Sequence, residues 1–245
     1  MNPQELFKAG KLNEAISALS SQLRDNPSDP KNRTFLFELL CFAGEYDRAQ
    51  KQLSILEQES NKDSILGTLL YRAAINAEKI RQEMFENKTY PKRVVNGAST
   101  AVKGKLNGKE FQTLSDADPR IGEKLEVFAA GDYMWISYQD IAALRMEPPK
   151  RLRDLLWVPA KLLTGPTFQS RDLGEILLPA ISPLSWQHED GEVRLGRVTE
   201  WCEDESGEVA PFGQKVLLVD GEEVPFLEVR ELEIYASSSL AAAQV

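Results

Sequence analysis

Apolar residues recur with a helical period over the first third of the chain. In residues 12–23 they fall three and four positions apart, which places them on one face of a helix. Three more faces of this kind follow at 35–42, 46–56 and 63–85. Asp63 stands where the last of these helices begins, and its side chain suits an N-cap. The pattern therefore predicts a region of amphipathic helices.

The helical region repeats at a spacing of about 34 residues, the length of a tetratricopeptide repeat. At this spacing Gly10 aligns with Gly44, and Ala15 aligns with Ala49. The glycines permit a tight turn between paired helices, and the alanines let the two helices approach closely. A third unit would contribute only its first helix. We therefore expect residues 1–92 to form an all-α, tetratricopeptide-like domain.

Arrays of such repeats bind peptides or helices on a concave face, which the first helix of each pair lines. The repeat register predicts the partner-binding residues Phe7, Lys8, Thr34, Glu38, Cys41, Phe42, Thr68, Arg72, Ile75 and Asn76. The alternative is that so short an array only docks onto the rest of the chain. The sequence leaves both arrangements open.

Residues 87–101 mix Pro, Gly, Asn and Ser and interrupt the helical period, which marks a boundary. Beyond it, short apolar runs alternate with turn signals such as Asn107-Gly108 and Gly131-Asp132, which are typical of hairpins. We expect strands at 126–129, 133–137, 155–161, 176–178, 197–201, 215–219 and 226–235.

Residues 139–146 predict a short helix, which Pro148 ends. The strands do not alternate with long helices, so a doubly wound nucleotide-binding fold is not expected. The predicted class is α+β, in which a mixed, mainly antiparallel β domain at 93–236 follows the helical repeat. Residues 237–245 predict a disordered tail.

The net charge of −9 comes entirely from the second part of the chain. Residues 1–92 hold 13 Lys+Arg and 13 Asp+Glu, whereas residues 93–245 hold 16 and 25. An acidic surface disfavours nucleic acid and anionic membranes as partners. No apolar run is long enough to span a bilayer or to resemble a signal peptide. Cys41 and Cys202 are far apart in the sequence, which predicts two reduced thiols and no disulfide framework. Because reduced thiols are typical of the cytoplasm, we expect a cytoplasmic protein.

A dense run of charged residues lies at 114–126. Asp116 and Asp118, together with His188, suggest one alternative function, a metal-dependent hydrolase. Arg120, however, stands where a further ligand would be expected, and its charge repels a metal ion. We therefore predict no metal, cofactor or catalytic residue. The same residues predict a structural network of ion pairs and caps, made of Asp116, Asp118, Arg120, Glu126, Arg153 and Asp154.

The remaining candidates for chemistry are few. His188 is the only histidine, which disfavours a catalytic triad and a His-rich metal site. No glycine-rich phosphate loop is present in the sequence. Trp135 and Trp157 lie in apolar runs and predict core packing, whereas Trp186 lies in a polar loop. Trp186 is therefore the expected exposed tryptophan and a candidate interface anchor.

Three blocks of sequence, in this order, carry a resemblance to a known family. They are LSDADPRIGEKLEVFAAGDYMW from Leu114, RLRDLLWVPA from Arg151, and the closing segments TEW, GQKVLLVD and LEVRELEIY. Together they resemble the ImpE/TagJ family, accessory proteins of the bacterial type VI secretion machine. The resemblance covers nearly the whole chain and implies a non-enzymatic adaptor. Its implied partner is the N-terminal helix of the small contractile-sheath subunit, with an indirect link to the AAA+ unfoldase that recycles the sheath.

The resulting hypothesis is a two-domain adaptor that modulates sheath assembly or recycling. An amphipathic helix of the sheath subunit would lie in the repeat groove, with apolar anchors at i, i+3, i+4 and i+7. Phe42 and Ile75 would supply apolar contacts to it, and Glu38 and Arg72 would set its polarity. A self-associating scaffold is a further alternative.

Overall fold

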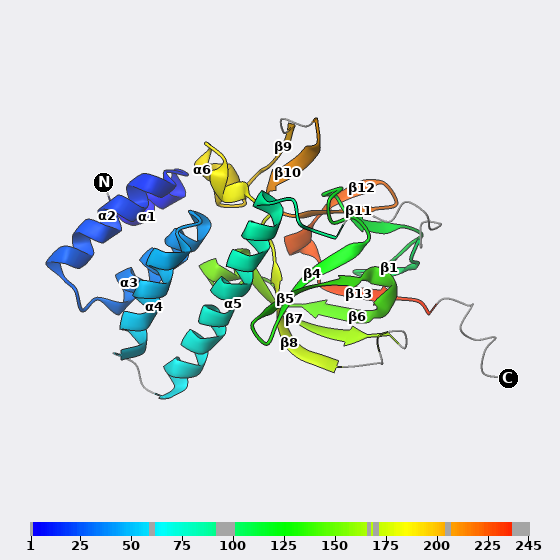
Figure 1. Ribbon diagram of the computed structural model, residues 1–245, viewed down its shortest axis with the longest axis horizontal. Helices are drawn as coiled ribbons and strands as arrows, with labels where there is room; N and C mark the ends of the chain where they lie inside the picture. The colour runs from blue at the N-terminus through cyan, green and yellow to red at the C-terminus, as the bar shows by residue number, and fades with distance from the viewer. Residues whose placement is uncertain are drawn as a thin grey trace.

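The computed structural model describes residues 2–58, 62–91, 101–165, 168, 172–203 and 207–236. Figure 1 shows helices at one end of the molecule and strands at the other. The chain is therefore an α+β protein, as the sequence predicted. The predicted tail at 237–245 and most of the predicted boundary segment lie outside the described residues.

The first helices pair as the repeat pattern predicts. They are α1 (Pro3–Lys8), α2 (Leu12–Asp25), α3 (Pro30–Phe42), α4 (Tyr46–Gln58) and α5 (Lys62–Glu86). Gly10 and Gly44 both have a φ of 72°, in the left-handed region. At each turn the next N–H donates to a carbonyl five residues back, from Lys11 to Leu6 at 2.9 Å and likewise after Gly44. The two turns are therefore structural repeats of one another.

Helix α5 runs further than the repeat period would allow. A third turn at the same spacing would fall near Glu78, but α5 continues to Glu86. It ends at Lys88, whose φ is 49°, with Thr89 N–H donating to the Met84 carbonyl at 2.9 Å. The additional turns bring buried side chains of α5 against the strands.

An eight-stranded antiparallel sheet dominates the second half, in the order β2-β1-β13-β6-β7-β8-β4-β5. Its strands are β1 (Gly104–Leu106), β2 (Lys109–Phe111), β4 (Lys124–Ala129), β5 (Asp132–Ser137), β6 (Ile141–Met146), β7 (Trp157–Thr164), β8 (Asp172–Pro179) and β13 (Glu231–Ile234). Strand β5 forms one edge and lies against α5. The sheet therefore reaches the helical repeat through this edge.

Smaller elements surround the large sheet. Two further sheets are β12-β11-β3 and β10-β9. Their strands are β3 (Leu114–Asp116), β9 (Thr199–Glu203), β10 (Val209–Gly213), β11 (Val216–Val219) and β12 (Glu222–Pro225). The short helices are α6 (Gly191–Arg194) and the 3₁₀ turns η1 (Tyr138–Asp140), η2 (Leu152–Leu155), η4 (Ser185–Gln187) and η5 (Phe226–Glu228). In Figure 1, α6 lies between the first helices and the β9–β10 hairpin.

The predicted helix at 139–146 is wrong. The segment forms η1 and then β6, which lies between β13 and β7 in the sheet. Ile141, Leu144 and Met146 are buried, at intervals of three and two residues. The pairing of β6 with β7 shifts between Ile141 and Ala143, as a β-bulge does. The extra residue of a bulge breaks the alternation of a strand and imitates the three-residue step of a helix.

Two cores fill the molecule, and one of them joins its halves. The first contains the apolar faces of the helices together with Phe128, Trp157 and Leu177 of the large sheet. The second lies within the β region and includes Phe111 and Phe226. Helical repeat and sheet therefore share a continuous core. Among the described residues, no helix has the length and apolar character needed to cross a membrane.

Gly44→Ala tests the turn of the second repeat. A Cβ at Gly44 would lie 2.6 Å from the Trp186 ring, and the φ of 72° already strains an alanine. We expect a loss of unfolding free energy of about 2–4 kcal/mol from backbone strain and overpacking together. Gly108→Ala is the matched control, because its φ is also positive but no atom lies within 4 Å. Urea denaturation measures both, and equal losses would contradict the role of the Trp186 contact.

Candidate functional site

The concave face of the repeat is largely covered by the chain's own β region. Glu38, Cys41, Phe42 and Ile75, all predicted to face a partner, are buried. They belong to, or lie beside, the core that Leu156 and Trp157 complete from the sheet side. The predicted groove with Phe42 and Ile75 as apolar anchors is therefore not open in this structure. Its face docks onto the rest of the chain, the other arrangement that the sequence left open.

Other predicted partner-binding residues make contacts within the chain. Phe7 packs edge-on against Phe35, and the Arg197 guanidinium lies 4.7 Å from the centre of its ring. The Lys8 side chain is exposed at the end of α1. Arg72 and Asn76 do not face the sheet but α4. Arg72 pairs with Glu57 at 2.6 Å, and the side-chain amide of Gln50 donates from Nε2 to Asn76 Oδ1 at 2.8 Å.

Of the remaining predicted residues, Thr34 is partly exposed and Thr68 is buried. They line a cleft of about 460 Å³ between the repeat and the loop that carries η2. The apolar lining comes from the helices, and the cationic lining comes from Arg151 and Arg153 of η2 and its flank. Arg153 is held in place, because it pairs with Glu38 at 3.1 Å and stacks on Tyr71. The cleft therefore combines an apolar lining with a cationic one.

A buried ion pair connects α5 to the sheet. Arg81 of α5 donates from Nε to Glu126 Oε1 at 2.7 Å and from a terminal nitrogen to Glu126 Oε2 at 3.0 Å. Both residues are almost completely excluded from solvent. Arg81 also pairs with Glu78 at 2.9 Å and donates to the Ile181 carbonyl at 3.0 Å. Bidentate geometry of this kind is directional, so it fixes the orientation of α5 on the sheet.

A second buried cation completes the cluster. Lys215, which precedes β11, lies 2.6 Å from Glu126 Oε2 and also donates to Asp116. Burial raises the pKa of Glu126, but the charges of Arg81 and Lys215 outweigh it and lower the pKa to about 2. Burial raises the pKa of Asp116 to about 6, against the opposing effect of Lys215. Burial is the largest cause of the raised pKa of Asp116, and the nearby charges of Glu126 and Asp118 raise it further.

Polar side chains donate hydrogen bonds to the carboxylate oxygens of Glu126 and Glu78. The Tyr133 hydroxyl donates to Glu126 at 2.6 Å, and the Trp135 indole donates to that hydroxyl in turn. On the other side, the Trp157 indole donates to Glu78 at 2.8 Å. These buried charges therefore have the additional hydrogen bonds that offset the cost of removing them from water.

The remaining residues of the predicted network occupy separate places. Arg120 pairs bidentately with Asp118, with its shortest contact at 2.6 Å. Asp154 accepts backbone N–H groups of Lys150 and Arg151 at 2.9 Å and so caps η2. Arg153 reaches Glu38 of the helical repeat instead of the carboxylates of its own region. The network is therefore one buried cluster with two peripheral groups, and it is not a single site.

Sequence reasoning missed Arg81, Glu78 and Lys215, which supply most of the cluster. Arg81 and Glu78 lie on the apolar face of α5, where their spacing matches that of buried residues. Lys215 alternates with Leu217 and so shares its inward face of the strand. In each case, the sequence placed a charged residue at a position that the helical or strand periodicity assigns to the buried face. Their partners are distant in the sequence, so the pairing itself was not readable.

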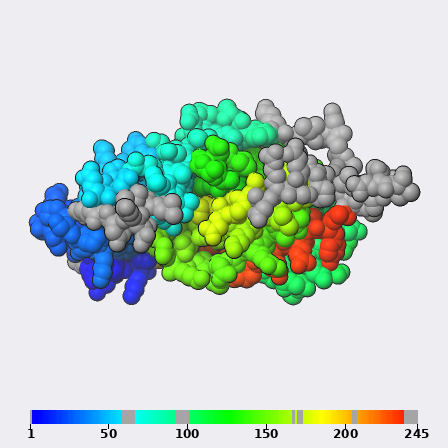
Figure 2. Space-filling model, turned by 90° about the horizontal axis from the view of Figure 1, so that it is seen from below, coloured from blue at the N-terminus to red at the C-terminus, as the bar shows by residue number. Residues whose placement is uncertain are grey.

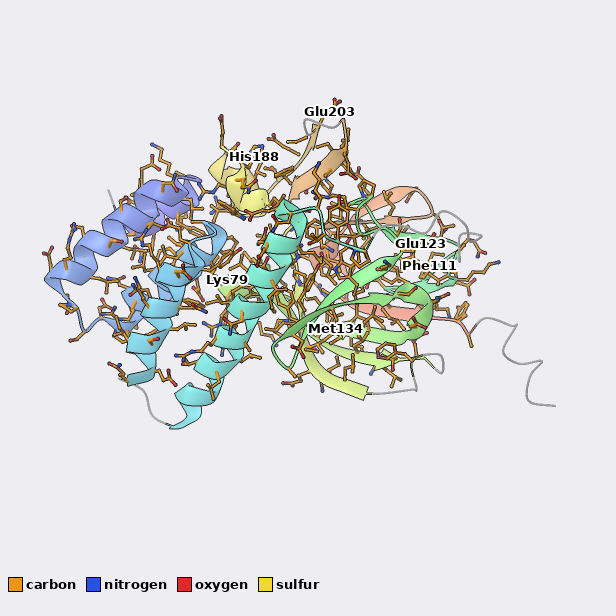
Figure 3. All side chains as sticks on the ribbon, viewed as in Figure 1. Lys79, Phe111, Glu123, Met134, His188 and Glu203 are labelled. Carbon is orange, nitrogen blue, oxygen red and sulfur yellow. The ribbon has the colours of Figure 1, made fainter. Side chains whose placement is uncertain are left out.

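The residues proposed for a metal hydrolase are engaged elsewhere. Asp116 is paired with Lys215, and Asp118 is paired with Arg120. His188 Nε2 lies 3.4 Å from Glu200 Oε2, and Figure 3 shows His188 near α6. Among the described residues, no three His, Cys, Asp or Glu side chains are grouped so as to hold a metal ion. The arrangement is chemically one of ion pairs between cations and carboxylates.

The tryptophans differ from expectation at two positions. Trp135 was predicted to pack in the core, but it is only partly buried and belongs to neither core, although its ring lies against Phe85. Trp186 is not an exposed anchor, because its ring packs over Gly44 and is only partly accessible. Trp201 on β9 is the exposed one. Trp157 is buried in the shared core, as the sequence predicted. A polar loop sequence therefore did not imply an exposed ring, because the loop folds back onto the repeat.

These features define a helical-repeat protein whose repeats are fixed to an antiparallel β region by buried ion pairs. The sequence model of the ImpE protein family matches residues 108–233, and a tetratricopeptide-repeat model matches residues 6–72. A Pseudomonas aeruginosa protein described as the type VI secretion system accessory component TagJ is 33% identical over 266 residues. That alignment covers 95% of this chain and 91% of the relative. The chain belongs to the ImpE family, which confirms the resemblance seen in its sequence blocks.

A solved structure shows the same fold. The crystal structure of a protein from Vibrio parahaemolyticus superposes with a TM-score of 0.81. The match covers 97% of this chain and 99% of that chain, at 20% sequence identity. The joint arrangement of helical repeat and β region is therefore shared by two chains of low sequence identity.

Arg81→Met tests the buried ion pair. The substitution keeps the bulk of the side chain but leaves Glu126 and Glu78 without their shared cation. We expect the unfolding free energy to fall by about 3–5 kcal/mol, the usual cost of breaking a buried pair. Arg145→Met is the matched control, since its pair with Glu231 at 2.9 Å is exposed and should contribute about 0–1 kcal/mol. Similar losses for the two variants in urea denaturation would show that the buried pair is not decisive.

The buried carboxylates predict a specific dependence of stability on pH. Because the pKa of Asp116 is raised from 3.8 to about 6, the folded protein binds this proton more tightly than the unfolded chain does. The Asp116 contribution therefore falls as the pH rises from about 4 to 6. Glu126 acts oppositely, because its stabilisation is present above pH 4.5 and is lost as the pH falls toward 2.

Asp116→Asn separates these two effects. We expect it to remove the decline between pH 4 and 6.5, which amounts to at most about 3 kcal/mol at about 1.4 kcal/mol per pKa unit. Chemical denaturation of both proteins at the two pH values measures the difference. If the variant loses as much stability between them as the natural chain, Asp116 does not carry the shifted pKa.

Proposed function

We propose that this chain is a cytoplasmic, non-enzymatic accessory component of a type VI secretion system. In this role it binds the N-terminal helix of the small contractile-sheath subunit and modulates sheath assembly or recycling. The observation that carries the proposal is the 33% identity, over 95% of the chain, to a type VI accessory component. Any effect on the sheath-recycling AAA+ unfoldase would be indirect, through the shared sheath subunit.

The helical repeat supports a role in binding another protein. Stacked helical pairs present long apolar faces that accept peptides and amphipathic helices. In this chain the repeat is fixed to the sheet by the Arg81–Glu126 pair and by a common core. A surface fixed in this way loses little conformational entropy when a helix binds to it. The rigid repeat therefore suits an adaptor.

The charged cluster supports a structural role over a catalytic one. Asp116, Glu126 and Asp118 each accept hydrogen bonds from a cation of the same chain. A metal ion or a substrate would have to displace Lys215 or Arg120 from these carboxylates. Because the displaced charge would remain buried and unpaired, that exchange is costly. We therefore assign the cluster a structural role, which is to hold the helical repeat against the sheet.

Calorimetry with the intact chain tests the proposal. We expect a 1:1 complex with the small sheath subunit of the same organism, with a Kd of about 1 μM or tighter, equivalent to about −8 kcal/mol. The isolated N-terminal helix of that subunit, as a peptide, should retain most of the affinity. A sheath subunit that lacks this helix is the control and should not bind. Absence of binding to both the subunit and the peptide would overturn the proposed function.

A further inference from the structure

A small cavity lies where the helical repeat meets the β region. On the face that Figure 2 shows, the blue and cyan helices lie directly against the green β region. The walls of the cavity come from the turn between α3 and α4, from α5, and from the segment that leads from β8 through η4 to α6. Its volume is about 20 Å³, and a cavity needs about 10–15 Å³ to hold one water molecule. The cavity is therefore of the right size for a single small ligand.

Three residues that line this cavity each carry a buried polar atom without a hydrogen bond. The atoms are the Ser182 hydroxyl oxygen, the Trp186 indole nitrogen Nε1 and the Arg194 nitrogen Nε. Within the described part of the chain, only six buried side-chain atoms have no hydrogen-bond partner, and these are three of them. Buried polar groups without a partner are costly and therefore rare in folded proteins. Three of them around one cavity indicate that they share a partner there.

Other polar groups of the same segment are bonded within the protein. Ser185 and Ser182 are both 1% exposed. The Ser185 hydroxyl, however, donates to the Ser182 carbonyl at 2.6 Å and accepts from the Gly213 N–H at 2.8 Å. The Leu184 N–H donates to the side chain of Gln82 on α5 at 2.8 Å. The segment is therefore closely fitted to α5 and β10, and its unbonded side-chain atoms belong to residues that line the cavity.

The chemistry of the three groups specifies a hydrogen-bond acceptor. The N–H groups of Trp186 and Arg194 can only donate, whereas the Ser182 hydroxyl can donate or accept. A water oxygen accepts two hydrogen bonds and donates through its own O–H groups. One water molecule can therefore accept from Trp186 and Arg194 and donate to Ser182. Three hydrogen bonds are the usual number for a buried water molecule.

A small anion is the other acceptor of this size. Arg194 would favour it, because its guanidinium is a cation, although burial lowers the pKa of that group against the smaller effect of Glu45. Glu78 opposes it, because this residue also lines the cavity and a carboxylate repels an anion. An anion such as chloride also has no O–H group with which to donate to an acceptor. A neutral molecule that both accepts and donates fits the cavity better.

We propose that one structural water molecule binds in this cavity, where it accepts from Trp186 and Arg194 and donates to Ser182. The water connects η4 and α6 at a point where both also contact the helical repeat. The Trp186 ring packs against Gly44, and Arg194 donates from a terminal nitrogen to Asn13 of α2 at 3.2 Å. The site therefore contributes a second polar connection between the repeat and the β region. It does not depend on the function proposed above.

Ser182→Ala tests the site through the sign of its effect on stability. If the hydroxyl is bonded to the water, its loss should lower the folding equilibrium constant about fivefold, the effect of one hydrogen bond. If the hydroxyl has no partner, its removal relieves the cost of burying it, and the constant should rise. An unchanged or raised constant in urea denaturation would overturn the proposal. Ser185→Ala is the matched control, because it is equally buried, loses two hydrogen bonds within the protein and should lower the constant in either case.

A double-mutant cycle with Arg194→Lys tests whether the groups share one partner. Lysine keeps the positive charge but places no N–H group where Nε of Arg194 lies. Because the water is then held less firmly, Ser182→Ala should have an effect at least about twofold smaller in this background. Equal effects of Ser182→Ala in the two backgrounds would show that the groups do not share a partner.

High-resolution diffraction from crystals of the full-length chain identifies the ligand directly. We expect one density peak within about 3.2 Å of Ser182 Oγ, Trp186 Nε1 and Arg194 Nε. In crystals grown with bromide in place of chloride, this peak should give no anomalous signal. A bromide signal at the peak would show that the ligand is an anion and would overturn the assignment of water. Absence of any peak in the cavity would overturn the site itself.

Discussion

The arrangement of this protein depends on the buried bidentate ion pair between Arg81 of α5 and Glu126 of β4. Two charges removed from water must find good partners, because an unpaired buried charge costs several kcal/mol. That requirement explains why Lys215, Glu78, Tyr133 and Trp157 surround the pair. It also restricts how α5 can lie on the sheet, since a shift of a few ångströms would break several charged hydrogen bonds together. Apolar packing alone would tolerate such a shift more easily.

The ion pair has consequences for both faces of α5. To reach Glu126, the helix continues beyond the point where its repeat would turn, and it carries Arg81 and Phe85 into the β region. The inward face of the repeat is thereby covered by the sheet, and Phe42 and Ile75 become core residues. On the outward face, Leu69 and Ile80 are exposed, and in the described part of the chain no second helix follows α5 to pair with it. In this protein, the face with which such repeats usually bind a partner contacts the chain's own β region instead.

Sequence patterns predicted the local elements well where one periodicity applied. The repeat turns at Gly10 and Gly44, the β4–β5 hairpin and the α+β class were all readable from spacing and turn residues. The pattern failed at β6, because a bulge gave a strand the spacing of a helix. It also failed for Trp186, whose polar neighbours concealed a ring packed against Gly44. Local periodicity has no information about a bulge or about what a loop folds back upon.

The sequence by itself determined the family, through its three blocks, and the existence of an acidic cluster around Asp116 and Asp118. It also determined which helices are amphipathic, since that property depends only on local spacing. Only the tertiary structure decided which apolar face is buried and which cations neutralise the carboxylates. Arg81 and Lys215 come from segments far from Glu126 in the chain, and their pairing depends on the completed fold. The helical register shows which residues of a helix share a face. What covers that face depends on contacts with distant segments, here the buried pairing of Arg81 with Glu126.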